Sequence, residues 1–301
     1  MYDKEINKLK QVVGENLWNL LAEQGCYIAG GALTSVFSNQ PINDVDVYFP
    51  NEEAFTKVMQ IIFDVDNLRS DYDMDYKDAM VNHVSGKAVL LLNENQQKIQ
   101  LIAHKFYPYG TNIFDDFDFT INMAMVYMKD GFFACDVNFF KHLAQRYLHV
   151  NTDTSYPLIS VMRVDKYRKR GYNISKAQML RLLLAVNRKN IDSWQKLADE
   201  LGGMYGTMPE EIFDYNSPFS LDEAIQKLDG FDIKDTIRIN HPQYDDVIKT
   251  MPWAFTKEAK DKLLEEVKKD LNRYIGYHYS DYYQETISKL QKTIDMLEKF
   301  T

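Results

Sequence analysis

The sequence predicts an α+β domain at residues 1–150, in which helices flank a mixed sheet, followed by a mostly helical domain at residues 151–301. In the first half, short apolar segments bounded by glycine and proline alternate with helical patterns, which is typical of an α+β fold. After Pro157 helical spacing dominates. A chain of 301 residues is also long enough to bury two ordinary cores. We therefore expect two domains with a boundary near residues 150–157.

The first elements follow from local patterns. Residues 4–24 place their apolar side chains on one helical face, and Gly25 suits a left-handed cap at the end of that helix. Residues 26–29 are short and apolar, as in a buried strand. The glycine pair Gly30-Gly31 then predicts a turn into a helix at residues 32–38.

The remaining elements are predicted in the same way. Polar and apolar residues alternate at residues 44–49, which indicates a strand with one buried face, and Asn51 can cap the helix that follows. Residues 88–92 and 99–103 indicate a hairpin. The later segments are a buried apolar stretch at 118–126 and helices at 158–170, 175–188, 191–201, 222–228, 256–275 and 281–300.

Composition and charge exclude several classes of protein. The longest apolar runs are far shorter than the ~20 residues that span a bilayer, and no signal peptide precedes them, so we expect no membrane contact and a cytoplasmic location. A net charge of −9 argues against a protein that coats nucleic acid. Any polynucleotide contact must be local, and the dense basic cluster lies at residues 166–170. Cys26 and Cys135 have no metal-ligand or redox spacing and are expected to be free thiols.

Asp44 and Asp46 are the candidate catalytic and metal-binding residues. Residues i and i+2 of a strand project to one face with α-carbons roughly 6.5–7 Å apart, which allows two carboxylates to hold the metal ions used in phosphoryl transfer. Hard oxygen ligands suit Mg²⁺ or Mn²⁺. An isolated D-x-D is more often an exposed strand face that happens to carry two aspartates.

The glycine pair favours the functional interpretation. Gly30 and Gly31 stand between a predicted strand and a predicted helix, where missing side chains let a triphosphate approach backbone amides. Thr34 and Ser35 could donate further hydrogen bonds. Twelve residues separate Gly31 from Asp44, and the combined pattern is more specific than either half.

These residues resemble a known family. The segments 27–31 (YIAGG) and 43–48 (NDVDVY) resemble the signature of the polymerase-beta nucleotidyltransferase superfamily, in particular its CCA-adding enzyme and poly(A) polymerase branch. Residues 117–124 (FDFTINMA) are similar to the R-R-D-F-T-I-N-A-L motif of that branch, and residues 162–174 resemble its L-R-A-I-R-F segment. Several bacteriophage-encoded nucleotidyltransferase-like proteins look closer still, and a phage protein would work in the host cytoplasm.

The resemblance implies a polymerase-beta-like mixed sheet and a metal-dependent transfer of a nucleotide from an NTP to an acceptor hydroxyl, with release of pyrophosphate. By the same carry-over, Asp44 and Asp46 hold Mg²⁺ or Mn²⁺. The acceptor could be an RNA 3′ end (tRNA-like), a protein or a small molecule. Residues implied to bind the nucleotide, together with Gly30, Gly31, Thr34 and Ser35, are Asp118, Asn122, Arg163 and Lys166.

Three departures from the family pattern keep a rival interpretation open. Gln100 stands where many members carry a third carboxylate, Asp116 and Phe117 replace paired arginines, and Thr34 replaces an arginine. The alternative is a catalytically silent binding or regulatory module of the same fold. A third interpretation is an interaction protein whose C-terminal helix mediates assembly, although the apolar repeat of that helix is more often packing on its own domain.

Overall fold

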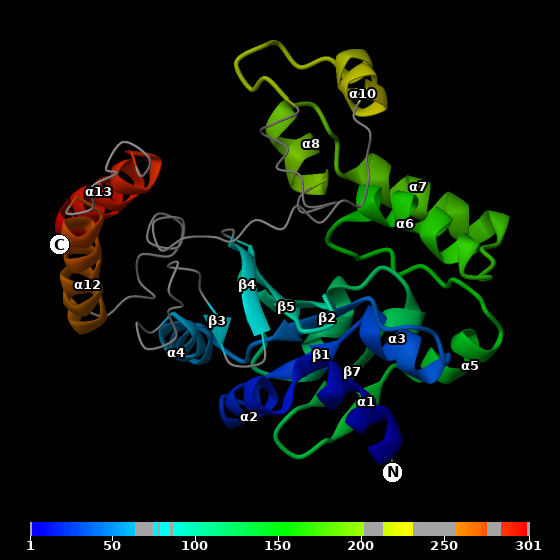
Figure 1. Ribbon diagram of the computed structural model, residues 1–301. Coiled ribbons are helices and arrows are strands. Elements are labelled where there is room, and N and C mark those ends of the chain that lie inside the picture. The colour runs from blue at the N-terminus through cyan, green and yellow to red at the C-terminus, as the bar shows by residue number, and fades with distance from the viewer. Residues whose placement is uncertain are drawn as a thin grey trace.

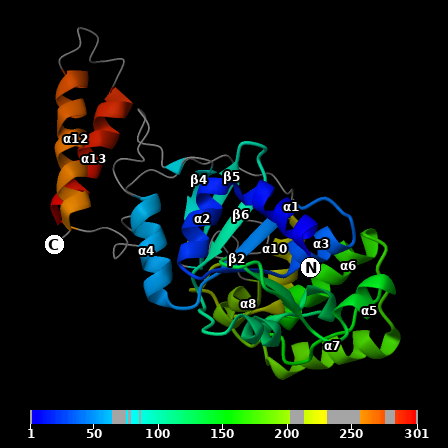
Figure 2. The same ribbon diagram turned by 90° about the horizontal axis from the view of Figure 1, so that it is seen from below.

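The computed structural model describes residues 2–63, 75–76, 79–84, 87–201, 213–230, 257–275 and 284–299. The described part of the chain is mixed α+β (Figures 1 and 2), as the sequence predicts. The helices of the first half are α1 (Asp3–Val13), α2 (Glu15–Glu23), α3 (Gly31–Phe37), α4 (Glu52–Ile62) and α5 (Phe139–Ala144). Two 3-10 helices accompany them, η2 (Gly110–Asp116) and η3 (Thr120–Asn122).

Eight described strands form one mixed sheet in the order β3-β4-β5-β6-β2-β1-β7-β8. Of the strand pairs that the structure describes, β2 with β6 is parallel and the others are antiparallel. The strands are β1 (Tyr27–Ala29), β2 (Asp44–Tyr48), β3 (Asp75–Tyr76), β4 (Ala79–Val84), β5 (Ala88–Asn93), β6 (Lys98–Ile102), β7 (Ala124–Tyr127) and β8 (Phe133–Cys135).

The second half is helical over its described residues. Its elements are α6 (Pro157–Lys169), α7 (Lys176–Arg188), α8 (Trp194–Leu201), α10 (Leu221–Gly230), α12 (Lys257–Ile275) and α13 (Gln284–Lys299). Helices α6, α7, α8 and α10 lie on the opposite side of the sheet from α1 and α2 (Figures 1 and 2). Helices α12 and α13 lie side by side, and the apolar repeat of α13 buries Leu290, Ile294 and Leu297 within the chain.

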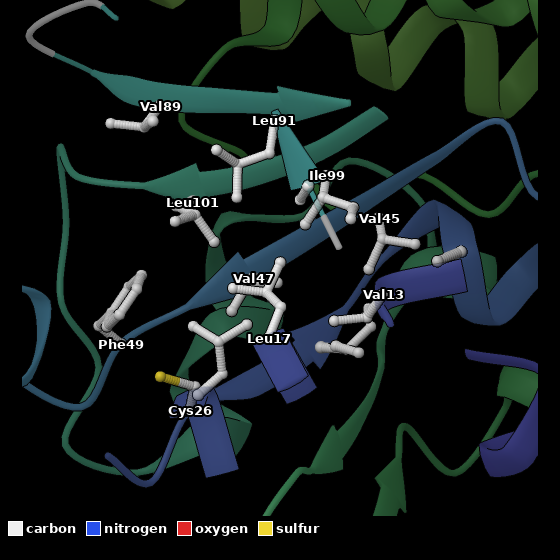
Figure 3. Packing of buried hydrophobic residues seen from close by; sticks show 14 of the residues in the cluster. Val13, Leu17, Cys26, Val45, Val47, Phe49, Val89, Leu91, Ile99 and Leu101 are labelled. Carbon is white, nitrogen blue, oxygen red and sulfur yellow. The ribbon is translucent and has the colours of Figure 1, made fainter. Parts of the chain in front are cut away.

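The sheet has two unlike faces. Helices α1, α2 and α4 pack on the first face, where the side chains of β2, β5 and β6 meet theirs in the main core (Figure 3). Val45 and Val47 of β2 point into this core and have no exposed surface. A smaller apolar cluster, built around Tyr27, Tyr48 and Met125, lies apart from that core. Because strand side chains alternate, Asp44, Asp46 and Tyr48 of β2 lie on the face of the sheet opposite Val45 and Val47, the second face.

The helix predicted at residues 4–24 is divided in two at Gly14. Residues 4–24 do not form a single helix, because Gly14 has φ 87° and ψ 147° and divides the segment into α1 and α2. That backbone region is essentially closed to residues with a β-carbon. The apolar periodicity continues across the break, which is why the sequence pattern alone suggests one helix.

No helix in the described part of the chain is long and apolar enough to cross a membrane. Both cysteines are free thiols, with Cys26 buried and Cys135 half-buried.

Candidate active site

Asp44 and Asp46 lie on the second face of the sheet, as the predicted alternation of β2 requires. Both are half-buried, while Val45 and Val47 between and after them are fully buried on the other face. Asp46 is opposite Ala29 of β1 on one side and opposite Gln100 of β6 on the other. The strand register therefore places an amide directly beside the second aspartate.

The two carboxylates influence each other. Burial, together with the neighbouring charge of Asp44, raises the pKa of Asp46 to about 7. The positive charges of Arg163 and Lys166 act in the opposite direction. An anionic pair that is partly withdrawn from water and opposed by cations is a site suited to binding a cation or a charged substrate.

The donor set fits a small divalent cation. Two carboxylates share one face and an amide oxygen stands alongside, which matches the preference of Mg²⁺ for oxygen ligands. Among the residues that the structure describes, no group of three or more His, Cys, Asp or Glu side chains gathers into a metal-binding cluster. One or two carboxylates are enough for Mg²⁺, since this ion usually keeps several of its waters. Asp44 and Asp46 are therefore the residues that would hold it.

The glycine turn beside the aspartates contains two different glycines. Gly30 has φ 85° and donates its N–H to the Ala124 carbonyl at 3.2 Å, and a β-carbon there would come within 3.3 Å of the Phe117 ring. Gly31 has the ordinary φ of a helix start, and a β-carbon there would meet nothing within 4 Å. Gly30 is needed for the backbone, whereas Gly31 leaves open space next to the site.

Asp118 and Asn122 lie in a buried polar network. Their side chains are 2% and 1% exposed, and the Asn122 amide donates to Asp118 Oδ1 at 2.8 Å. Thr34 is also buried: its hydroxyl donates to the Ile121 carbonyl at 2.5 Å and lies 3.1 Å from Asn122 Oδ1. The contacts of these three residues are with the protein, so their expected contact with nucleotide stays a prediction.

Arg163 and Tyr167, one turn apart on α6, complete this network. Arg163 Nη1 lies 2.9 Å from Asp118 Oδ2, as an ion pair that lacks the alignment of a hydrogen bond. Its Nη2 donates to the Tyr167 hydroxyl at 3.3 Å, and that hydroxyl donates to Asn122 Oδ1 at 2.7 Å. Negative charge on Asp118 and Asp46, together with Tyr167, raises the pKa of Arg163 despite its burial. The guanidinium is therefore a permanent cation near the carboxylate pair.

Two predicted residues remain, Lys166 and Ser35, and they differ in exposure. Lys166 is exposed on α6 and its charge acts on Asp46, so it lies on the side of the candidate site. Ser35 is 5% exposed on α3, and its expected contact with nucleotide stays a prediction. Tyr167 was not predicted as a site residue, because a tyrosine within a helical pattern gives the same sequence signal as a core residue.

Asp116 stands where the family that the sequence resembles has arginine. It forms a polar cluster with its neighbours. Burial alone would raise its pKa, but hydrogen bonds from Lys105, Ser155 and Tyr107 prevail and lower it. Phe117 beside it packs its ring against Gly30 and Tyr48. These two positions thus support the turn and its surroundings and add no positive charge to the site.

One family model matches the first half of the chain. Residues 3–146, which include the aspartate pair and the glycine turn, match the model of the Gabija anti-defense 2 family proteins. The protein named "Gabija anti-defense 2" from Bacillus phage SPbetaL7 is 32% identical over 254 residues. That alignment covers 82% of this chain and 60% of the relative. The chain therefore spans about 60% of the length of this Gabija anti-defense 2 protein.

Solved structures with similarity to the chain include CCA-adding enzymes. The Thermotoga maritima CCA-adding enzyme complexed with tRNA_CCA has 13% identity and a TM-score of 0.44, with 90% of this chain and 60% of that chain covered. A tRNA nucleotidyltransferase complexed with a primer tRNA and an incoming ATP analog has 13% identity and a TM-score of 0.40, with coverages of 85% and 68%. At these values the chains differ in much of their detail.

Proposed function

We propose that this chain is a metal-dependent nucleotidyltransferase that moves a nucleoside monophosphate from an NTP to an acceptor hydroxyl. The observation that carries the proposal is the placement of Asp44 and Asp46 on one face of β2, beside the Gly30-Gly31 turn. The acceptor oxygen forms a bond to the α-phosphorus. The bond between that phosphorus and the oxygen that bridges it to the β-phosphorus breaks, and pyrophosphate leaves. The proton of the acceptor hydroxyl passes to solvent.

Each group has a role in this proposal. Asp44 and Asp46 hold Mg²⁺ or Mn²⁺, which when bound neutralises phosphate charge and orients the reacting oxygens. Gly31 leaves room for phosphate oxygens near the turn. Arg163 and Lys166 of α6 supply positive charge that acts on Asp46. The acceptor is an RNA 3′ end, a protein or a small molecule, and the test below detects transfer to the first two classes.

The test follows labelled nucleotide into products. The purified chain is incubated with each α-³²P-labelled NTP, Mg²⁺ or Mn²⁺, and total cellular RNA and protein. We expect transfer of label by the native chain and none by Asp44→Asn/Asp46→Asn. Glu52→Gln/Glu53→Gln, a matched pair on the exposed first turn of α4, should transfer label as the native chain does. Failure of the native chain to transfer label, with NTP binding intact, would favour a silent binding module.

The matched relatives suggest a biological role. We infer that the chain counters the Gabija defense system, since residues 3–146 match a family named for that effect. The test is the plating efficiency of a Gabija-sensitive phage on cells that carry the defense system and express the native chain or Asp44→Asn/Asp46→Asn. If the native chain restores plating and Asp44→Asn/Asp46→Asn does not, the anti-defense role depends on the carboxylate pair. Restoration by both would separate the role from catalysis.

A further inference from the structure

Four side chains form a closed polar ring between η3 and α6. The ring runs from Asp118 to Asn122 (2.8 Å), to the Tyr167 hydroxyl (2.7 Å), to Arg163 (3.3 Å) and back to Asp118 (2.9 Å). Three of the four links are hydrogen bonds, and the fourth, between Arg163 and Asp118, is an ion pair. Asn122 donates through its amide nitrogen and accepts through its oxygen, and Tyr167 donates to Asn122 while accepting from Arg163.

The ring is buried except at one member. Asp118, Asn122 and Tyr167 are 1–2% exposed, whereas the side chain of Arg163 is 36% exposed. Three members are therefore fixed by packing, and Tyr167 is further held edge-on against Phe119 and Tyr172. A guanidinium has five N–H donors in a rigid plane, so contacts on its buried side leave donors directed outward.

The ring adjoins the glycine turn: the hydroxyl of Thr34, on the first turn of α3, lies 3.1 Å from Asn122 Oδ1, and Asp118 follows Phe117, whose aromatic ring packs against Gly30. A planar fork of N–H donors at that place suits a phosphate group, which it can bind through two parallel hydrogen bonds. Such a contact depends on orientation as much as on charge. A guanidinium that rotates freely keeps the charge but loses the paired geometry.

We propose that the Tyr167 hydroxyl is a positioning group that fixes the plane of Arg163 toward a phosphate of the bound nucleoside triphosphate. This inference rests on the proposed function. Asp118 alone does not fix that plane, since its contact with Arg163 is an ion pair without hydrogen-bond alignment. The second contact, from Nη2 to the Tyr167 hydroxyl, defines the orientation, and Asn122 holds the hydroxyl in turn. Asp118 and Asn122 act as positioning residues and Arg163 is the group that touches substrate.

A double-mutant cycle tests this assignment through equilibrium binding. Dissociation constants for each NTP with Mg²⁺ are measured by calorimetry for the native chain, Tyr167→Phe, Arg163→Met and the double variant. We expect Tyr167→Phe to weaken binding about 3–10-fold and Arg163→Met about 10–100-fold, as for loss of charge-assisted hydrogen bonds. The double variant should bind as Arg163→Met does, because the hydroxyl acts only through the guanidinium.

Tyr172→Phe is the matched control. Tyr172 packs edge-on to Tyr167 at 5.6 Å, but its hydroxyl has no place in the ring of Asp118, Asn122, Tyr167 and Arg163. Its removal should leave NTP affinity unchanged, and melting curves of all variants check that the fold persists. Native-like affinity in Tyr167→Phe, or an equal loss from Tyr167→Phe in the Arg163→Met background, would overturn the positioning role. Absence of NTP binding by the native chain would overturn the proposed function as well.

Discussion

At the scale of single residues, Asp46 connects function with stability. Its folded pKa of about 7 lies above the usual value for aspartate near 3.9, so the folded state holds the proton more tightly than the unfolded state. Stability is therefore lost as pH rises from about 4 to about 7. Ionisation of both Asp44 and Asp46 therefore lowers the stability of the fold when no cation is bound.

Asp46→Asn should remove that cost. In the presence of EDTA we expect the variant to be more stable than the native chain by about 1–3 kcal/mol at pH 8 and little different at pH 5, where Asp46 is already protonated. Thermal melts at the two pH values measure this. Glu94→Gln, at an exposed turn position, is the control and should change neither melt. Equal melting temperatures for Asp46→Asn and the native chain at pH 8 would contradict the prediction.

The glycine pair gives a second prediction at this scale. Gly30→Ala should lower stability by about 1–3 kcal/mol, because φ is 85° there and the added carbon approaches Phe117. Gly31→Ala should leave stability unchanged or slightly higher, since the carbon meets open space at a helix start. If phosphate occupies that space, Gly31→Ala weakens NTP binding without unfolding. Chemical denaturation and calorimetry together separate the two glycines, and similar behaviour of both variants would refute the distinction.

At the scale of elements, the break between α1 and α2 depends on one residue. Gly14→Ala should cost about 1–3 kcal/mol, since φ 87° with ψ 147° is a region that only glycine occupies readily. Its neighbour offers a control: Glu15→Ala removes an exposed ion pair with Lys10 and should stay within about 0.5 kcal/mol of the native chain. Urea denaturation of both variants measures the difference. A Gly14→Ala variant as stable as the native chain would show that α1 and α2 can join.

The elements also show what could be predicted from the sequence. The alternation in β2 and the hairpin of β5 and β6 were predicted from residue patterns, because a strand with one buried face leaves a clear period of two. Strand β8 and helix α5 were missed because they are short, and strand β4 because a register shift between Val81 and His83 interrupts its alternation. The break at Gly14 needs a backbone angle that no periodicity reports.

The candidate site was predicted unevenly for a similar reason. Asp44, Asp46 and the glycine pair are close in sequence and occupy a recognisable strand and turn. The ring of Asp118, Asn122, Arg163 and Tyr167 joins segments about 45 residues apart, and its pairing is set by tertiary packing. Motif resemblance suggested three of its four members but gave no sign that Tyr167 joins them.

At the scale of the whole molecule, helices α6 and α7 share a core with the sheet. Val164, Tyr167 and Leu182 belong to the same apolar cluster as the sheet and its helices. Backbone bonds also cross residues 150–157, including Leu148 N–H to the Asn173 carbonyl at 2.8 Å. The sheet and helices α6 and α7 should therefore unfold together.

Leu182 and Leu180 on α7 test that cooperativity. Leu182 has no exposed surface, so Leu182→Ala should lower stability by about 2–5 kcal/mol and shift the unfolding of sheet and helices equally. Leu180 is 57% exposed, and Leu180→Ala should change stability by less than about 0.5 kcal/mol. Hydrogen exchange at β1, β2 and α7 follows the two parts separately. Loss of protection confined to α7 in Leu182→Ala would show that the parts unfold independently.

The register of β2 with β6 has an evolutionary consequence. Gln100 stands opposite Asp46, at the place from which a third acidic ligand would reach the same cation. Glutamine codons differ from glutamate codons only in their first base, so a single transversion would restore a carboxylate at this position without altering the sheet. A population under selection for stronger metal binding would pass through that change easily. One base change therefore separates this two-carboxylate site from a three-carboxylate site.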